Sequence, residues 1–327
     1  MTDDRLGPRT RSRRGDLDEL LDDHRVLLTG YCYRILGSAF EADDAVQETL
    51  LRAWRGFEGY AGRGTLRSWL YRIATNVCLD MLHGRQRRAR PMDVTAPGDR
   101  GLGTRLPDNT WIEPIPDGRV LRTDGDPAEV VVARDSVRLA FVTALQYLPP
   151  RQRAVLILRD VLRWSAGEVA ELLDTTVGAV DSALHRARST LRAGHLTPAE
   201  PMDESQRALV ARYVDAFERF DIDRLVSLLH EDATLSMPPY TLWLQGPDDI
   251  ARWWTGAGRN CRGSRVQRVA ANGSPAFAQW RPTVPGGAFD AWAIHVIELS
   301  GPTISGVHCF RDPALFGLFG LPARVHG

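Results

Sequence analysis

The sequence predicts a multidomain chain: two all-α helical domains, the second containing a helix-turn-helix, followed by a C-terminal α+β domain. Apolar residues recur every three to four positions over residues 16–90 and again over 136–195. From about residue 203, two amphipathic helices give way to strand-like runs such as PAFAQWRP. At 327 residues the chain is too long for one ordinary domain, and 43% hydrophobic residues can supply several cores.

Two segments lack this periodicity. Residues 1–15 are polar, basic and rich in helix breakers, so we expect them to be disordered. Residues 91–135 contain six prolines, carry excess negative charge and keep no regular period, which predicts a flexible acidic linker. Its only apolar stretch, WIEPIPDG at residues 111–118, is expected to anchor on a neighbouring surface.

Charge is uneven along the chain although its net value is zero. Residues 1–90 carry +3, residues 91–136 carry −4 and residues 137–196 carry +3. All 41 basic side chains other than histidine are arginines, which suit phosphate contacts. Two basic blocks around an acidic one are a weak indication of nucleic-acid binding.

Several classes of protein and site are not indicated. No apolar run is long enough to span a bilayer, and the N-terminus is not a secretion signal, so we expect a cytoplasmic protein. We predict no metal site, no cofactor and no disulfide, because the cysteines are far apart and form no CxxC pair. Buried free thiols are expected at Cys32, Cys78, Cys261 and Cys309.

The helix-turn-helix is the most specific signal from the residues alone. SAGEVAELL and VGAVDSALHRARSTLRA form two helical runs separated by a short break. Ser165 with Glu168 forms a predicted capping box for the first run. The polar face of the second run offers side chains to DNA, namely Ser182, His185, Arg186 and Arg188, together with Asp181. The alternative is a helical hairpin with a solvated charged face.

A second candidate nucleic-acid surface follows the run LRSWLYRIATNVCLDMLHGRQRR. Trp69, Arg72 and Asn76 combine stacking and hydrogen-bonding groups of the kind that bind unpaired bases. The arginines after them, Arg85, Arg87, Arg88 and Arg90, would contact phosphates. The alternative is that the aromatic residues are core and the arginines are solvated.

An acidic helix face precedes this run, made by Asp43, Asp44, Gln47 and Glu48. Acidic residues near a helix start are favoured by the macrodipole, which is the simpler explanation. The other is a docking site for a basic partner.

These segments together resemble extracytoplasmic-function (ECF) sigma factors of the sigma-70 family. The resemblance rests on EADDAVQETLLRAWRGF, the run that contains Trp69, and LPPRQRAVLILRDVLRWSAGEVAELLDTTVGAVDSALHRARSTLR, in the family's order, and covers about residues 16–195. It implies sigma region 2 at residues 16–90 and sigma region 4 at residues 136–195. It also implies core RNA polymerase and promoter DNA as partners.

The resemblance assigns roles to the candidate residues. It implies that Asp43, Asp44, Gln47, Glu48 and Trp54 dock on the clamp helices of the polymerase's largest subunit. Trp69, Arg72, Asn76 and the following arginines would melt and read the minus-ten element. Region 4 would lie on the flap of the second-largest subunit and read the minus-thirty-five element, while the linker threads the RNA channel. Asp181, Ala183 and the loop GYAGRG depart from the usual pattern, so the promoter sequence does not carry over.

The C-terminal part, residues 203–320, resembles the SnoaL-like fold, a cone of curved sheet closed by helices. The resemblance rests on YVDAFERFDIDRLVSLLHEDATLSMPP, LQGPDDIARWW and ISGVHCFRDPALFGLFGLP. It implies a regulatory domain of a sigma-factor subgroup, of which WIEPIPD in the linker is also typical. A pocket for an unidentified small ligand could be lined by Trp243, Trp253, Trp254, Phe277, Trp280, Trp292, Phe310, Asp232 and His308. The alternative is that the aromatic residues are simply core.

Two other functions remain open at this stage. An isomerase, cyclase or hydrolase fused to a DNA-binding module would use Asp232, Asp290 or His308 as its acid or base in an apolar pocket. A fold does not by itself imply chemistry, so we predict no catalytic residue. A helix-turn-helix repressor would leave the acidic face and the run around Trp69 without a role.

Overall fold

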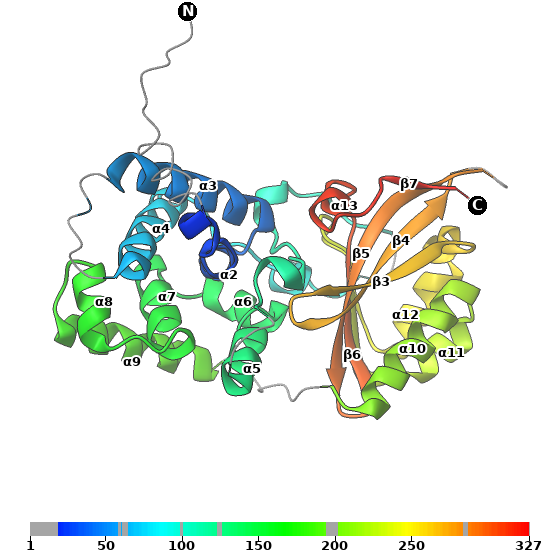
Figure 1. The fold of residues 1–327 in the computed structure, drawn as a ribbon. Coiled ribbons are helices and arrows are strands. Elements are labelled where there is room, and N and C mark those ends of the chain that lie inside the picture. Colours follow the sequence, from blue (N-terminus) through cyan, green and yellow to red (C-terminus); the bar gives the residue numbers. More distant parts are fainter. Residues whose placement is uncertain are drawn as a thin grey trace, which may run out of the picture.

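The structure is a computed structural model that describes residues 19–57, 60, 65–98, 101–122, 126–193, 202–283 and 287–326. The segment expected to be disordered, residues 1–15, lies outside these ranges. Figure 1 shows a helical half beside a domain built on a twisted sheet, as the predicted fold class requires.

The first helical group consists of α2 (Arg25–Leu36), α3 (Ala39–Gly56) and α4 (Leu66–Leu82). Gly37 ends α2 in the left-handed region with a φ of 71°, and the Ser38 side chain caps α3 by accepting a hydrogen bond from the Glu41 backbone nitrogen. Tyr31 and Tyr71 meet in the core with their ring centroids 5.0 Å apart. Helix α4 ends at Leu82, so the arginines that begin at Arg85 lie outside it.

The described residues of the segment 91–135, namely 91–98, 101–122 and 126–135, differ from the flexible linker that their composition predicts. They form three short 3-10 helices and one α-helix: η2 (Pro91–Asp93), η3 (Asp108–Thr110), η4 (Asp117–Arg119) and α5 (Pro127–Asp135). Trp111, Ile112 and Ile115 are buried, so the apolar stretch anchors the segment as expected. Backbone hydrogen bonds to both halves of the molecule hold this segment in place. Their partners lie far away in the chain, so a local sequence pattern does not reveal them.

The second helical group contains α6 (Leu139–Gln146), α7 (Pro150–Leu156), a π-helical turn η5 (Ile157–Val161), α8 (Ala166–Leu172) and α9 (Val177–Ala193). Ser165 and Glu168 form the predicted capping box at the start of α8. Asp174 adopts a φ of 50° in the turn before α9. Helices α8 and α9 are the predicted helix-turn-helix.

The C-terminal domain begins with α10 (Glu204–Arg219) and α11 (Ile222–Ser227). Its seven strands are β1 (Leu229–Ser236), β2 (Trp243–Gln245), β3 (Arg265–Ala271), β4 (Ser274–Pro282), β5 (Phe289–Ser300), β6 (Thr303–Phe310) and β7 (Arg324–Val325). The order is β2-β1-β6-β5-β4-β3, with β7 paired to β5, and only β1 and β6 run parallel among these pairs. The remaining helices are α12 (Pro247–Thr255), η6 (Ala257–Cys261) and α13 (Ala314–Leu318).

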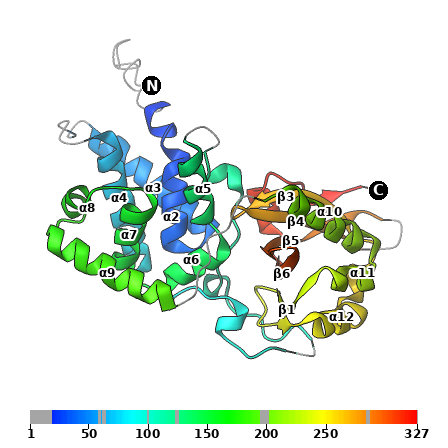
Figure 2. The same ribbon diagram turned by 90° about the horizontal axis from the view of Figure 1, so that it is seen from below.

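The sheet separates two cores. On strand β4, Ala276, Ala278 and Trp280 belong to the core that continues into the helical half, whereas Phe277 belongs to the core under α10 and α12. Successive side chains of a strand point to opposite faces, so both faces of this sheet are covered. Figures 1 and 2 show the sheet between α10–α12 on one side and the helical half on the other.

Two further expectations concern membranes and cysteines. None of the helices in the described ranges is long and apolar enough to cross a membrane. All four cysteines are free. Cys32, Cys78 and Cys309 are buried, whereas Cys261, also expected to be buried, is partly exposed. Within the same ranges, no group of three or more potential ligands is placed to hold a metal ion.

Candidate functional site

Helix α9 presents the predicted polar face to solvent. Ser182, His185 and Arg186 are exposed, while Val180, Leu184 and Ala187 are buried against the preceding helices. Arg188 differs from the others because its guanidinium forms a bidentate ion pair with Asp160, at 2.6 and 2.9 Å. The exposed face therefore has three of the four predicted side chains available, and the fourth already has a carboxylate partner.

Helix α4 brings the second candidate surface close to the helix-turn-helix. Trp69 stacks on Tyr60 with ring centroids 4.9 Å apart, and Asn76 is exposed. The Arg72 Nη2 donates a hydrogen bond of 2.8 Å to the Glu171 carbonyl oxygen of α8. Arg72, a candidate DNA-binding side chain of α4, is therefore hydrogen-bonded to the helix-turn-helix.

The arginines after α4 do not form one phosphate-binding row. Arg85 pairs with Glu41, and Arg87 lies over the Tyr147 ring at 4.0 Å. Arg90 is half-buried beside Asp93.

The burial of Arg88 contradicts the prediction that its side chain contacts phosphate. Its side chain is only 7% exposed, and its Nη2 lies 3.0 Å from a Glu41 carboxylate oxygen. Its Nη1 donates to the Trp111 carbonyl oxygen and lies 3.7 Å from Glu113. Burial raises the pKa of Glu113 while Arg88 acts in the opposite direction. Arg88 is thus a structural residue that connects α3 with the segment after α4.

The acidic face of α3 is exposed and partly paired. Asp44 and Gln47 are exposed, and Glu48 lies 2.6 Å from Arg52. Asp43 lies 2.8 Å from Arg119 of η4, so the segment 91–135 covers one end of this face. A groove of about 820 Å³ adjoins it, lined by Gln47, Leu51, Trp54 and residues of the chain before α2.

One buried asparagine of the C-terminal domain is hydrogen-bonded to several parts of the helical half. Asn272 lies in the turn between β3 and β4 and is fully buried. Its Nδ2 donates to the Tyr33 hydroxyl at 2.6 Å and to the Val137 carbonyl oxygen at 2.7 Å. Its Oδ1 accepts from the Ile115 nitrogen at 3.0 Å. One amide side chain thereby contacts both helical groups and the segment between them.

The neighbouring Gly273 fits this junction closely. Its nitrogen donates to the Asp117 carboxylate at 2.7 Å, and a Cβ added here would lie 2.6 Å from the Arg134 carbonyl oxygen. With a φ of 62°, the position also favours glycine. Sequence reasoning singled out neither Asn272 nor Gly273, although the Asn-Gly pair is a recognisable hairpin turn.

Comparison with known proteins identifies the family. The descriptions Sigma-70 region 2, Sigma-70, region 4 and SnoaL-like domain match residues 20–88, 138–191 and 210–306. The ECF RNA polymerase sigma factor SigG of Mycobacterium tuberculosis is 44% identical over 321 residues, which cover 95% of this chain and 85% of SigG. The chain belongs to the ECF sigma factors of the sigma-70 family.

Other relatives support the same assignment. The ECF RNA polymerase sigma factor SigW of Bacillus subtilis is 30% identical over 186 residues, 55% of this chain and 90% of SigW. The crystal structure of Mycobacterium tuberculosis SigJ, an extracytoplasmic function sigma factor, matches with a TM-score of 0.62 and 25% identity, covering 93% of this chain and 99% of SigJ. This sigma factor is therefore a transcription initiation factor that binds core RNA polymerase and promoter DNA, and it is not an enzyme.

The SnoaL-like domain of this sigma factor contains a pocket of about 360 Å³ on the α12 side of the sheet. Trp253, Trp254 and Trp292 line it, three of the nine residues named for a possible pocket. The sequence did not single out the polar lining, which comes from β4, β5, β6 and η6: Gln279, Arg281, His295, Cys309, Arg311, Asn260 and Cys261.

Six residues predicted for the pocket lie elsewhere. The Trp243 Nε1 donates to the Thr95 carbonyl oxygen, and the Trp280 Nε1 donates to the Pro322 carbonyl oxygen on the other face of the sheet. Asp232 is exposed. His308 lies on the face opposite the pocket, where its Nδ1 and the Ser236 hydroxyl are 2.8 Å apart. Phe277 and Phe310 are likewise core residues outside the pocket.

Three buried polar side chains of the pocket, Gln279, His295 and Cys309, are joined in one chain of hydrogen bonds. The His295 Nε2 lies 2.8 Å from Gln279 Oε1, and the Cys309 sulfur lies 3.0 Å from His295 Nδ1. Burial lowers the pKa of His295 to about 3 and raises the pKa of the Cys309 thiol. Both groups are neutral near pH 7, so this pair is not an activated nucleophile and its base.

Proposed function

We propose that this sigma factor docks on the polymerase clamp through the exposed part of α3 and contacts promoter DNA through α4 and α9. Support comes from the exposed Asp44 and Gln47 on α3 and from the exposed Ser182, His185 and Arg186 on α9. Asn76 and the stacked Trp69 supply the corresponding groups on α4. Arg88 is excluded from this surface because its side chain is buried.

On this proposal the structure describes a closed conformation, in which α4 of region 2 packs against α8 of region 4. Arg72 of α4 is hydrogen-bonded to α8, and the Tyr71 and Trp164 ring centroids lie 5.3 Å apart. Arg67 lies over both rings. Promoter reading by α4 requires Arg72 to leave α8, so regions 2 and 4 must separate when the holoenzyme forms.

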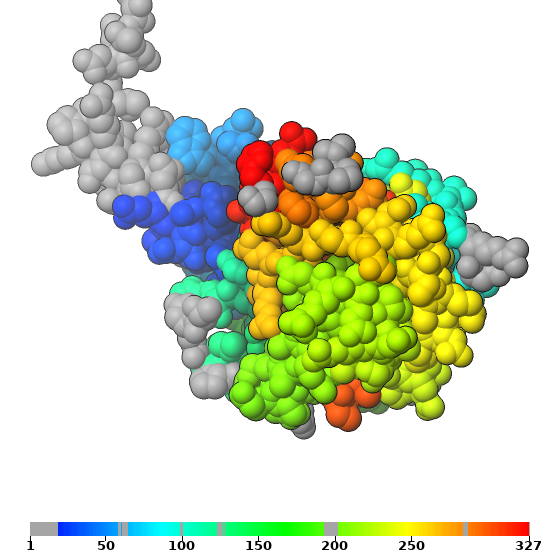
Figure 3. All heavy atoms as spheres, turned by 90° about the vertical axis from the view of Figure 1, so that its right-hand side faces the viewer, coloured from blue at the N-terminus to red at the C-terminus, as the bar shows by residue number. Residues whose placement is uncertain are grey.

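We further propose that the SnoaL-like domain modulates this opening by holding the linker. The hydrogen bonds of Asn272 carry the proposal, because they tie region 2, the linker and the start of region 4 to one turn of the SnoaL-like domain. The linker is also bonded to β2, where the Gly98 nitrogen donates to the Trp243 carbonyl oxygen at 2.8 Å. Figure 3 shows this part of the linker, in cyan, lying along the edge of the domain. A linker that enters the RNA channel must give up these bonds.

Asn272→Ala in the full chain tests the modulation. It removes the acceptor of the Ile115 nitrogen and the side-chain donor to the Val137 carbonyl oxygen, which costs about 1–3 kcal/mol for such buried groups. Because the cost falls on the closed state, we expect a gain in affinity for core polymerase of about 5- to 100-fold and a higher run-off transcription yield. Gln267→Ala, at an exposed position on β3, is the matched control. An unchanged affinity in Asn272→Ala would remove the SnoaL-like domain from the control of opening, but would leave the sigma function intact.

A further inference from the structure

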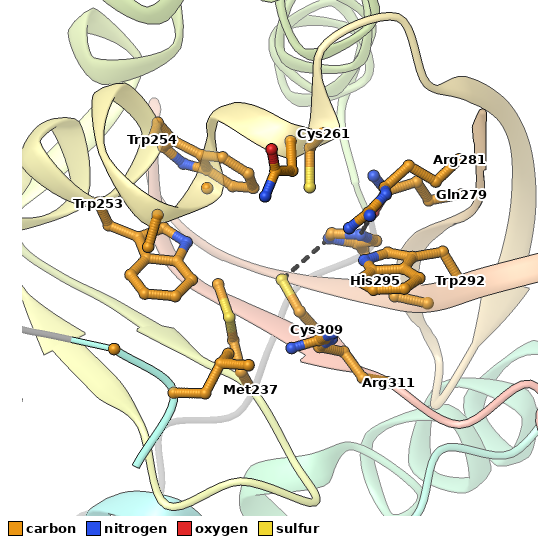
Figure 4. A pocket seen from close by; sticks show the side chains of 16 residues that line it. Met237, Trp253, Trp254, Cys261, Gln279, Arg281, Trp292, His295, Cys309 and Arg311 are labelled. Carbon is orange, nitrogen blue, oxygen red and sulfur yellow. Dashed lines mark hydrogen bonds between the residues drawn. The ribbon is translucent and has the colours of Figure 1, made fainter. Parts of the chain in front are cut away.

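The pocket of the SnoaL-like domain has a closed apolar floor. Trp253 and Trp254 of α12 and Met237 after β1 form it, and Leu102 of the linker completes one wall (Figure 4). Both tryptophans are at least nine-tenths buried. Flat aromatic surfaces of this kind pack well against a planar ring.

One polar atom on the floor has no partner. The Trp253 Nε1 is buried and donates to no acceptor within the described part of the chain. An indole nitrogen can only donate, and the π face of an aromatic ring bound on this floor can accept its hydrogen.

The other side of the pocket is positively charged. Arg281 and Arg311 lie over the Trp292 ring at 4.0 and 4.3 Å from its centroid. Figure 4 shows both guanidinium groups beside the pocket, with the Trp292 ring between them. Neither arginine forms an ion pair with a carboxylate of the described residues, and the Arg311 Nε is buried without an acceptor. Burial lowers the pKa of Arg311, and the charge of Arg281 acts in the same direction.

Among the residues that the structure describes, no aspartate or glutamate lines this pocket. Two cationic groups without a counter-ion favour an anion and disfavour a cation. A highly charged phosphate ester would fit the apolar floor poorly, because its oxygens would lose water without gaining partners there. The volume of about 360 Å³ also limits the ligand to a small molecule.

We propose that this pocket binds a small aromatic monocarboxylate, with its ring on the floor formed by Trp253 and Trp254 and its carboxylate beside Arg281 and Arg311. The pocket binds this ligand without converting it, because it contains no carboxylate base and His295 is engaged on both ring nitrogens. The inference concerns the pocket alone, so it stands whether or not the domain controls opening.

Isothermal titration calorimetry on the full chain tests the ligand class. The probes are benzoate, phenylacetate and 1-naphthaleneacetate, each compared with its neutral amide. We expect at least one acid to bind with a Kd on the order of 100 µM or tighter. Its amide should bind about tenfold more weakly, since it lacks the charge-assisted hydrogen bonds.

Variants locate the site. Arg281→Gln and Arg311→Gln should each weaken the acid about tenfold and leave the amide within about twofold. Arg268→Gln, an exposed arginine on β3, should change neither. The proposal is overturned if no acid binds up to about 5 mM, or if acid and amide bind equally well to the unmodified protein. It is also overturned if the two pocket variants bind the acid as tightly as Arg268→Gln does.

Discussion

Intramolecular partners decide what each predicted arginine does. Arg88 and Arg186 are both arginines in segments expected to contact DNA, and the sequence treats them alike. The structure gives Arg88 two carboxylates and buries it, whereas Arg186 is exposed on α9. Residue type and helix phase could be predicted from the local pattern. The partners of Arg88 could not, because Glu113 lies 25 positions away on a segment without periodicity.

Arg186→Ala tests the reading face of α9. We expect the holoenzyme to lose about 1–3 kcal/mol of promoter-binding free energy, through lost contacts with the duplex element. The measurement is fluorescence anisotropy with labelled promoter DNA at fixed salt, and Arg268→Ala on the SnoaL-like domain is the control. If the variant binds promoter and unrelated DNA with unchanged affinities, Arg186 lies outside the interface.

Arg88→Ala should act on stability and not on DNA. It leaves Glu41 and Glu113 without their buried partner, which we expect to lower the free energy of unfolding by about 3 kcal/mol. Arg87→Ala removes only an exposed contact with the Tyr147 ring and should cost about 0.5 kcal/mol. Urea denaturation followed by circular dichroism compares the two. Equal midpoints for the two variants would return Arg88 to the candidate DNA contacts.

In the strands β4 and β6, successive side chains face opposite sides of the sheet, and this alternation predicts which residues face the pocket. Gln279 and Arg281 face the pocket, so Trp280 between them must face the other way, and it does. Cys309 and Arg311 face it as well, which places His308 on the opposite face. The period of two was readable in the sequence. The sequence did not show which face is hollow, because this depends on how α12 lies on the sheet.

Strand β5 carries a group that should make the domain sensitive to acid. Burial lowers the pKa of His295 to about 3, against about 6.5 in an unfolded chain. Below pH 6.5 the unfolded state binds a proton that the folded state does not, so stability is complete above pH 6.5 and falls with decreasing pH. The expected slope approaches about 1.4 kcal/mol per pH unit between pH 6 and 5.

A second group acts in a different pH window. Burial raises the pKa of Glu298, but His308, Arg90 and Arg138 outweigh it and bring this pKa to about 2. Its contribution is lost only below about pH 4.5, the range of an unfolded glutamate. Chemical denaturation of His295→Gln from pH 7 to 5 separates the contribution of His295 from that of Glu298. In this range the free energy of unfolding of the variant should no longer fall with decreasing pH. A slope that persists in the variant would assign it to another group.

Across the whole molecule, the domains were easier to predict than their contacts. Periodicity and capping residues such as Ser165 indicated two helical domains and an α+β domain, and the fold class is confirmed. The close packing of these parts was not predicted, because it depends on single side chains far apart in sequence. Asn272 and Tyr33 are 239 positions apart, and no local pattern relates them.

Hydrogen exchange tests whether this packing opens when the holoenzyme forms. In the free protein the Ile115 and Asn272 amide hydrogens are buried at the junction and bonded across it, so we expect slow exchange. If core polymerase draws the linker away from the SnoaL-like domain, both should exchange at least tenfold faster in the complex. Amides between β4 and β5 supply the internal control, because their partners lie within one domain and should stay protected. Equal protection at the junction in the free and bound states would mean that polymerase binds the form in which the linker stays on the SnoaL-like domain.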